Sequence, residues 1–78
     1  MLQVRIVSPE GMLFNGQAVS VVCPGESGTF EVLPMHRPLL SRLRKGAVEV
    51  DGKYWAIKRG IMSVADDIVT VVVESPER

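Results

Sequence analysis

The side chains with reactive or metal-ligating chemistry are sparse, since His36 and Cys23 are the only histidine and cysteine. A metal site needs three or four closely arranged ligands, and the carboxylates near these two residues show no ligand spacing. We interpret His36 as a structural or interface histidine and Cys23 as a buried, inert thiol. A Cys–His nucleophile pair also needs a third group that orients the base, and the sequence indicates none. The sequence therefore predicts no catalytic, cofactor-binding or metal-binding residue.

Two further stretches could bind charged partners. Gly25-Glu26-Ser27-Gly28 has the glycines of a phosphate-binding loop but lacks its lysine and its following helix, which favours a plain turn. The basic residues Arg37, Arg42, Arg44 and Lys45 have no acid between them. They are either a solvated strand edge or a surface that docks an acidic partner, and both interpretations stay open. Nucleic acid is disfavoured, because no aromatic pattern for base stacking accompanies the arginines.

Length and composition describe one small domain. A chain of 78 residues buries only about 60% of its unfolded surface, so we expect marginal stability without a partner. Nine basic residues balance nine acidic ones, which argues against a nucleic-acid module. The single cysteine excludes an internal disulfide, and no span approaches 20 apolar residues. We therefore expect a cytoplasmic chain without direct membrane insertion.

The elements that position these residues have the two-residue period of β-strands, and no helical stripe of ten or more residues occurs. Asn15-Gly16 predicts a hairpin turn, and Gly25–Gly28 and Asp66-Asp67 predict further turns. Eight or nine short strands favour an all-β sandwich or barrel in one domain, residues 1–78. The strands are expected at Leu2–Ile6, Met12–Phe14, Ala18–Cys23, Thr29–Leu33, Leu39–Leu43, on both sides of Asp51-Gly52, and at Ile61–Ala65 and Ile68–Glu74.

Asp51-Gly52 predicts a two-residue hairpin turn that sets a register. That register places Val48 opposite Trp55, so Trp55 should point into the core. His36 lies between two prolines in a stiff loop and should be at the surface.

Seven short motifs follow one another along almost the whole chain. Their order and spacing resemble the N-terminal domain of the epsilon subunit of F-type ATP synthases. One departure lies at Gly28-Thr29-Phe30-Glu31, where that family usually has Gly-Glu-Leu-Gly. The matching motifs are Val7-Ser8, Phe14-Asn15-Gly16, Val19–Val22, Gly25–Gly28, Pro34-Met35-His36-Arg37-Pro38-Leu39-Leu40, Gly60–Val64 and Val69–Val73.

The resemblance implies a flattened antiparallel β-sandwich of two sheets with about eight to ten short strands. It also implies a non-catalytic rotor subunit of the central stalk, which couples ion-driven rotation to ATP synthesis. Such a subunit docks between the gamma subunit and the c-ring, in a complex attached peripherally to the cytoplasmic face of the bacterial inner membrane. Family members often continue into a C-terminal helical hairpin, and from Glu74-Ser75-Pro76-Glu77-Arg78 we expect no hairpin-type inhibition here.

The resemblance also assigns two groups of interface residues. The gamma-subunit interface comprises Ser8, His36, Pro38, Leu40 and Ser41. The c-ring interface comprises Gly28, Thr29, Phe30 and Glu31. Two alternatives stay open: a free-standing β-sandwich or barrel module that binds a peptide or small ligand, and a small enzyme with an unmarked site.

Overall fold

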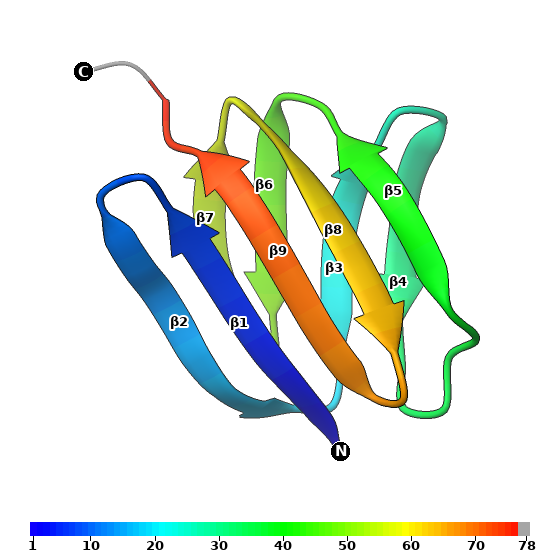
Figure 1. Ribbon diagram of the computed structural model, residues 1–78. Helices are drawn as coiled ribbons and strands as arrows, with labels where there is room; N and C mark the ends of the chain where they lie inside the picture. Colours follow the sequence, from blue (N-terminus) through cyan, green and yellow to red (C-terminus); the bar gives the residue numbers. More distant parts are fainter. Residues whose placement is uncertain (77–78) are drawn as a thin grey trace.

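Nine β-strands and no helix make up residues 1–76, the part of the chain that the computed structural model describes (Figure 1). The all-β prediction is therefore confirmed, while the last two residues of the predicted tail, Glu77 and Arg78, lie outside the described residues. The strands are β1 (Leu2–Ser8), β2 (Gly11–Ala18), β3 (Val21–Gly25), β4 (Gly28–Val32), β5 (Leu39–Leu43), β6 (Gly46–Val50), β7 (Lys53–Ile57), β8 (Arg59–Ala65) and β9 (Ile68–Glu74).

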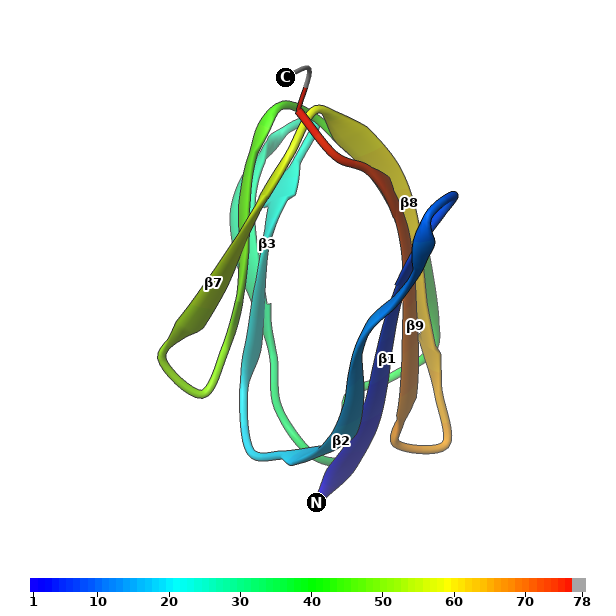
Figure 2. The ribbon, with the colours of Figure 1, turned by 90° about the vertical axis from the view of Figure 1, so that its left-hand side faces the viewer.

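All nine strands belong to one sheet, which curls over itself into two layers (Figure 2). Its order is β2-β1-β9-β8-β5-β3-β6-β7. The ninth strand, β4, is outside this order and among the described residues pairs only with β3. The neighbouring pairs are antiparallel except β1 and β9, which run parallel. The two predicted layers are thus continuous rather than separate sheets.

The layers join at a tight corner between β3 and β5. Only Gly25 and Leu43 pair there, and Arg44 extends the contact by donating its backbone N–H to the Pro24 carbonyl oxygen at 2.9 Å. Arg44 Nε also donates to the Gly25 carbonyl oxygen at 2.9 Å. Glycine is required at 46, because a Cβ there would lie 2.9 Å from Pro24 Cβ.

The core lies between the layers and follows the two-residue period of the strands. In β1, Leu2, Val4 and Ile6 are fully buried while Gln3 and Arg5 are exposed. The core side chains are Leu2, Val4, Ile6, Ala18, Val21, Cys23, Val32, Leu43, Val48, Val50, Ile57, Met62, Val64, Val69, Val71 and Val73.

The hairpin predicted at Asn15-Gly16 is wrong. β2 runs through both residues, with Asn15 opposite Arg5 and Gly16 opposite Val4 on β1. Pairing along the whole of β1 satisfies the backbone groups of β2, so tertiary pairing overrides the local turn preference. The turn that joins β1 to β2 lies between Ser8 and Gly11.

The hairpin predicted at Asp51-Gly52 is confirmed, with Val48 opposite Trp55. Trp55 is half-buried at the edge of the core, where its ring lies 5.3 Å from that of Phe14. The Asp51 carboxylate also holds the corner between β2 and β3. It accepts the backbone N–H of Val19 at 3.1 Å and that of Ser20 at 3.0 Å.

Candidate functional site

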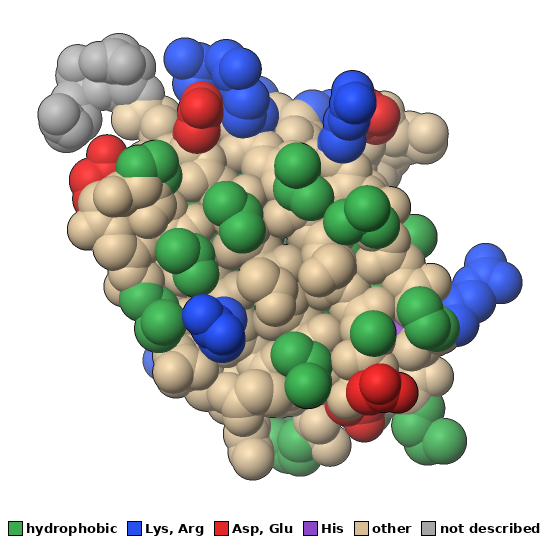
Figure 3. All heavy atoms as spheres, viewed as in Figure 1, with side chains coloured by type: hydrophobic (Ala, Val, Ile, Leu, Met, Phe, Trp, Pro, Cys, Tyr) green, Lys and Arg blue, Asp and Glu red, His purple; other side chains and the backbone are tan. Residues whose placement is uncertain are grey.

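A row of apolar side chains crosses the outer face of β1, β9 and β8. Val7 pairs with Val72, and Val72 pairs with Ile61, so the three side chains are neighbours across three strands. Val72 and Ile61 are 53% and 52% exposed. We call these three residues the apolar row. Figure 3 shows hydrophobic side chains scattered over this face, with most charged groups towards its margins.

The alternating sequence of β9 explains how one strand serves both the core and this face. Val69, Val71 and Val73 point inward and are buried. Ile68 and Val72 point outward and are more than half exposed, although both are apolar. Apolar side chains in water do not stabilise a domain, so the outer face fits a contact with another chain.

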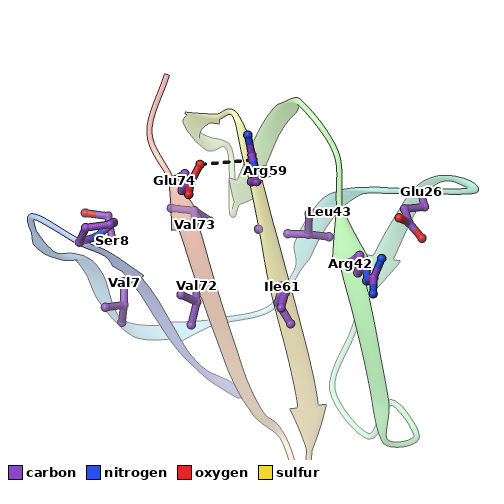
Figure 4. A pocket seen from close by; sticks show the side chains of 12 residues that line it. Val7, Ser8, Glu26, Arg42, Leu43, Arg59, Ile61, Val72, Val73 and Glu74 are labelled. Atoms are coloured by element: carbon purple, nitrogen blue, oxygen red, sulfur yellow. Dashed lines mark ion pairs between the residues drawn. The ribbon is translucent and has the colours of Figure 1, made fainter. Parts of the chain in front are cut away.

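A groove of about 650 Å³ runs beside the apolar row, and we call it the row groove (Figure 4). The apolar row lines it together with Leu43 and Val73. Its charged side chains are Glu26, Arg42, Arg59 and Glu74. Arg59 Nε lies 3.3 Å from Glu74 Oε1, an exposed ion pair that contributes little to stability. The groove therefore combines an apolar floor with both signs of charge.

A second groove of about 530 Å³ separates the β3–β4 hairpin from β5, and we call it the hairpin groove. Leu40 and Ser41, predicted for the gamma interface, line one part of it. Gly28, Thr29 and Phe30, predicted for the c-ring interface, line another. The structure thus brings members of both predicted groups to one groove, although their partners were expected to differ.

The other predicted gamma-interface residues lie apart from the hairpin groove. Ser8 is only 6% exposed and donates its Oγ hydrogen bond to the Gly11 carbonyl oxygen at 3.1 Å. Pro38 is exposed, and His36 is half-buried rather than fully at the surface. His36 Nδ1 lies 2.6 Å from the Arg37 carbonyl oxygen, which accepts a hydrogen bond when Nδ1 carries the proton.

The predicted c-ring group lies on strand β4, which overlaps the strand predicted at Thr29–Leu33. The Glu31 carboxylate is exposed, yet it already accepts a hydrogen bond from Ser20 Oγ at 2.6 Å. The Phe30 ring covers Gly25 so closely that a Cβ at 25 would lie 2.8 Å from it. Both side chains thus have roles within the domain, and their contact with a ring stays a prediction.

The basic residues of 37–45 have different environments in the structure. Arg44 is structural, because its side chain and backbone both bind the β3 corner. Arg42 lines both grooves, which favours the docking interpretation for this residue. Arg37 and Lys45 are exposed.

Several residues of this surface were missed from the sequence. Ile61 and Arg59 looked like ordinary strand residues, because only pairing with β9 places them beside Val72 and Glu74. The available signal was the apolar composition of both faces of Ile68–Val73, which indicated a covered outer face.

The groups with possible reactivity are placed unfavourably for chemistry. Cys23 is fully buried, and burial raises the pKa of its thiol to about 12, so the thiol stays protonated at neutral pH. Within residues 1–76, no three His, Cys, Asp or Glu side chains are grouped so that they could hold a metal ion. The same residues contain no helix with the length and apolar character to cross a membrane.

Comparison with known proteins defines the class. Residues 1–78 match the family described as ATP synthase, Delta/Epsilon chain, beta-sandwich domain. The chain belongs to this family, and the resemblance found in the sequence is confirmed.

Two curated relatives are named ATP synthase epsilon chain. The relative from Acidithiobacillus ferridurans is 41% identical over 99% of this chain and 57% of its own length. The relative from Nitratiruptor sp. is 44% identical over 94% of this chain and 60% of its own length. This chain thus spans about three fifths of the relatives' length.

The fold also occurs in a solved structure of the Tetrahymena thermophila mitochondrial ATP synthase, described as central stalk/c-ring. The TM-score is 0.82 at 12% identity, covering 95% of this chain and 63% of the other. At that identity the likeness establishes the shared fold alone.

Proposed function

We propose that this domain is the stalk-docking part of an epsilon-type subunit of an F-type ATP synthase, which joins the gamma subunit to the c-ring and so helps couple ion-driven rotation to ATP synthesis. The observation that carries the proposal is the apolar row in a member of this family. Three neighbouring apolar side chains from three strands form a strip on the outer face of the sheet, and two of them, Ile61 and Val72, are more than half exposed. A neighbouring subunit that covered the strip would remove this apolar area from water.

The two grooves extend the proposed contact. The row groove continues the apolar row towards Ser8 and Arg42. The hairpin groove continues from Arg42 to Leu40, which is 74% exposed. A partner that covered this side of the sheet would meet one surface of apolar side chains bordered by charges, which is the composition of a stable protein interface.

The role is mechanical rather than catalytic in this proposal. Torque passes between a ring and a shaft only if the junction does not slip, and a closely packed β-sandwich resists deformation. The proposed place of the domain is at the cytoplasmic face of the bacterial inner membrane, held there peripherally by the rest of the complex.

Gel filtration with a purified gamma subunit tests the proposal. The chain should co-migrate with gamma, and replacing Ile61 by Asp should abolish co-migration because it buries a charge in the apolar contact. Replacing the exposed Lys53 on β7 by Asp is the matched control and should leave co-migration intact. Separate elution of the unmodified chain and gamma would contradict the proposal and favour a free-standing binding module.

A further inference from the structure

The Asn15-Gly16 pair has a chemical reactivity that is separate from its turn preference. Glycine has no Cβ, so its backbone nitrogen can approach the side chain of a preceding asparagine without steric hindrance. In that reaction the Gly16 nitrogen bonds to Asn15 Cγ, the Cγ–Nδ2 bond breaks, and Nδ2 leaves as ammonia with the proton of the Gly16 N–H. Water then opens the cyclic imide on either side, which leaves an aspartyl or an isoaspartyl residue at position 15.

The strand conformation of β2 keeps the pair out of the geometry that this reaction needs. Ring closure requires the Asn15 backbone to rotate until the Gly16 nitrogen lies beside the Asn15 side chain, whereas an extended strand holds the two apart. Asn15 is paired with Arg5 and Gly16 with Val4 on β1. Neither Asn15 nor Gly16 has the positive φ of a hairpin turn. Rotation at Asn15 therefore requires β2 to separate from β1.

Two side chains add to this restraint. Gln3 Nε2 donates to Asn15 Oδ1 at 3.2 Å and to the Gly16 carbonyl oxygen at 3.4 Å, so one side chain of β1 bridges both residues. The Phe14 ring lies over Gly16, because a Cβ at position 16 would lie 3.3 Å from Phe14 Cζ. The same ring packs against that of Trp55. Asn15 and Gly16 are thus held by different neighbours.

The place of β2 in the sheet allows it to open without the rest of the domain. It stands at the end of the strand order, with β1 as its neighbour. Its ladder is interrupted by a bulge at Leu13, between the pairs that Phe14 and Met12 form with β1. A strand at the edge of a sheet opens locally at a lower free energy than the central strands.

We infer that Asn15 is a site of spontaneous modification that the pairing of β2 with β1 holds unreactive, and that Gln3 protects it. An aspartyl residue at position 15 would keep the backbone length and lie opposite Arg5, which is a favourable cross-strand pair. An isoaspartyl residue adds a carbon to the backbone of β2, so the strand no longer keeps one register with β1. The isoaspartyl form therefore records that β2 has opened and prevents it from pairing as before.

The first test compares the folded and the unfolded chain. Asn15 is the only asparagine, so mass spectrometry after proteolysis assigns the products without ambiguity. The natural chain is incubated in mildly alkaline buffer with and without urea. The folded chain should react slower by about tenfold or more, because it reacts only from the opened state. No reaction in the unfolded chain would overturn the site, and equal rates in both samples would overturn the protection.

The second test concerns Gln3. Gln3→Ala should speed the reaction of the folded chain by about threefold or more and leave the rate in urea unchanged, because Gln3 restrains Asn15 only within the sheet. Gln17→Ala is the matched control, since Gln17 is exposed and lies opposite Gln3, and it should change neither rate. An unchanged folded rate for Gln3→Ala would overturn the protecting role of this residue.

The third test separates opening of β2 from unfolding of the whole domain. A Cβ at Gly60 would lie 2.6 Å from the Val72 carbonyl oxygen, so Gly60→Ala should destabilise the domain from β8, which is not a neighbour of β2. The rate of the folded chain should nevertheless stay unchanged. A rate that rises in step with the loss of stability would overturn the separate opening of β2. Val64→Ala, a cavity in the same strand, serves the same purpose if Gly60→Ala does not fold.

Discussion

Replacing Gly60 by Ala tests whether the corner of the sheet is as tightly packed as the structure indicates. Gly60 lies inside β8, opposite Leu43 on β5 and Val73 on β9. A Cβ at this position would lie 2.6 Å from the Val72 carbonyl oxygen and 3.3 Å from the Val73 Cα. Both atoms belong to the backbone of the neighbouring strand, so rotation of a side chain cannot relieve the clash.

The expected magnitude follows from two opposing effects. Overpacking a well-packed site costs about 1–3 kcal/mol. Removing glycine restricts the unfolded chain and offsets about 0.4–1 kcal/mol of that cost. Because β8 is paired on both sides and cannot move away from β9, we expect the clash to cost about 3 kcal/mol, the upper end of that range, so that the free energy of unfolding falls by about 2 kcal/mol after the offset.

Urea unfolding followed by Trp55 fluorescence measures this change. With an m-value of about 1–2 kcal/mol/M, the midpoint should fall by about 1–2 M. Gly16→Ala is the matched control, because its Cβ would meet only the Phe14 ring, at 3.3 Å, and a ring edge can shift. Equal midpoints for Gly60→Ala and the natural chain, or an equally large loss for Gly16→Ala, would refute the packing argument.

Three further predictions concern docking, stability and the thiol. Leu40→Asp should weaken binding to gamma by about 2 kcal/mol or more in calorimetry while leaving the unfolding midpoint unchanged, because Leu40 is exposed within the domain. Asp51→Ala should lower the free energy of unfolding by about 2 kcal/mol in urea, since the N–H groups of Val19 and Ser20 lose a charged acceptor. Cys23 should resist alkylation at pH 8 until the chain unfolds. Because its folded pKa of about 12 exceeds the ordinary value of 9.0, stability should fall as pH rises between those values, and Cys23→Ala should lack that part of the slope.

The sequence predicted most of the local structure correctly. Leu39–Leu43 and Ile68–Glu74 have the predicted bounds, and the Asp51-Gly52 turn set the register of Val48 against Trp55. These elements can be predicted from the sequence, because the alternation of apolar and polar side chains and the preferences of turn residues act between residues close in the chain. The succession of motifs along the chain was also sufficient to indicate the family.

The predictions that were wrong concern segments whose structure depends on pairing with a strand that is distant in the sequence. Asn15-Gly16 has the composition of a turn, yet β1 supplies a partner for the whole of β2. The strand predicted at Ile61–Ala65 excludes Gly60, whereas Gly60 lies within β8 because only glycine fits beneath the β9 backbone. In both cases a local preference of about 1 kcal/mol is outweighed by ladder hydrogen bonds and packing.

The candidate surface shows the same division between sequence and structure. The residue types alone determined that Ile68–Val73 has two apolar faces and that Pro34 and Pro38 stiffen the intervening loop. Only the tertiary structure placed Val7, Val72 and Ile61 in one row and brought Asp67 to Met35 across 32 residues. The physical reason is that strand order and the close approach of turns depend on how the whole sheet curls, and no segment of the sequence encodes that curl by itself.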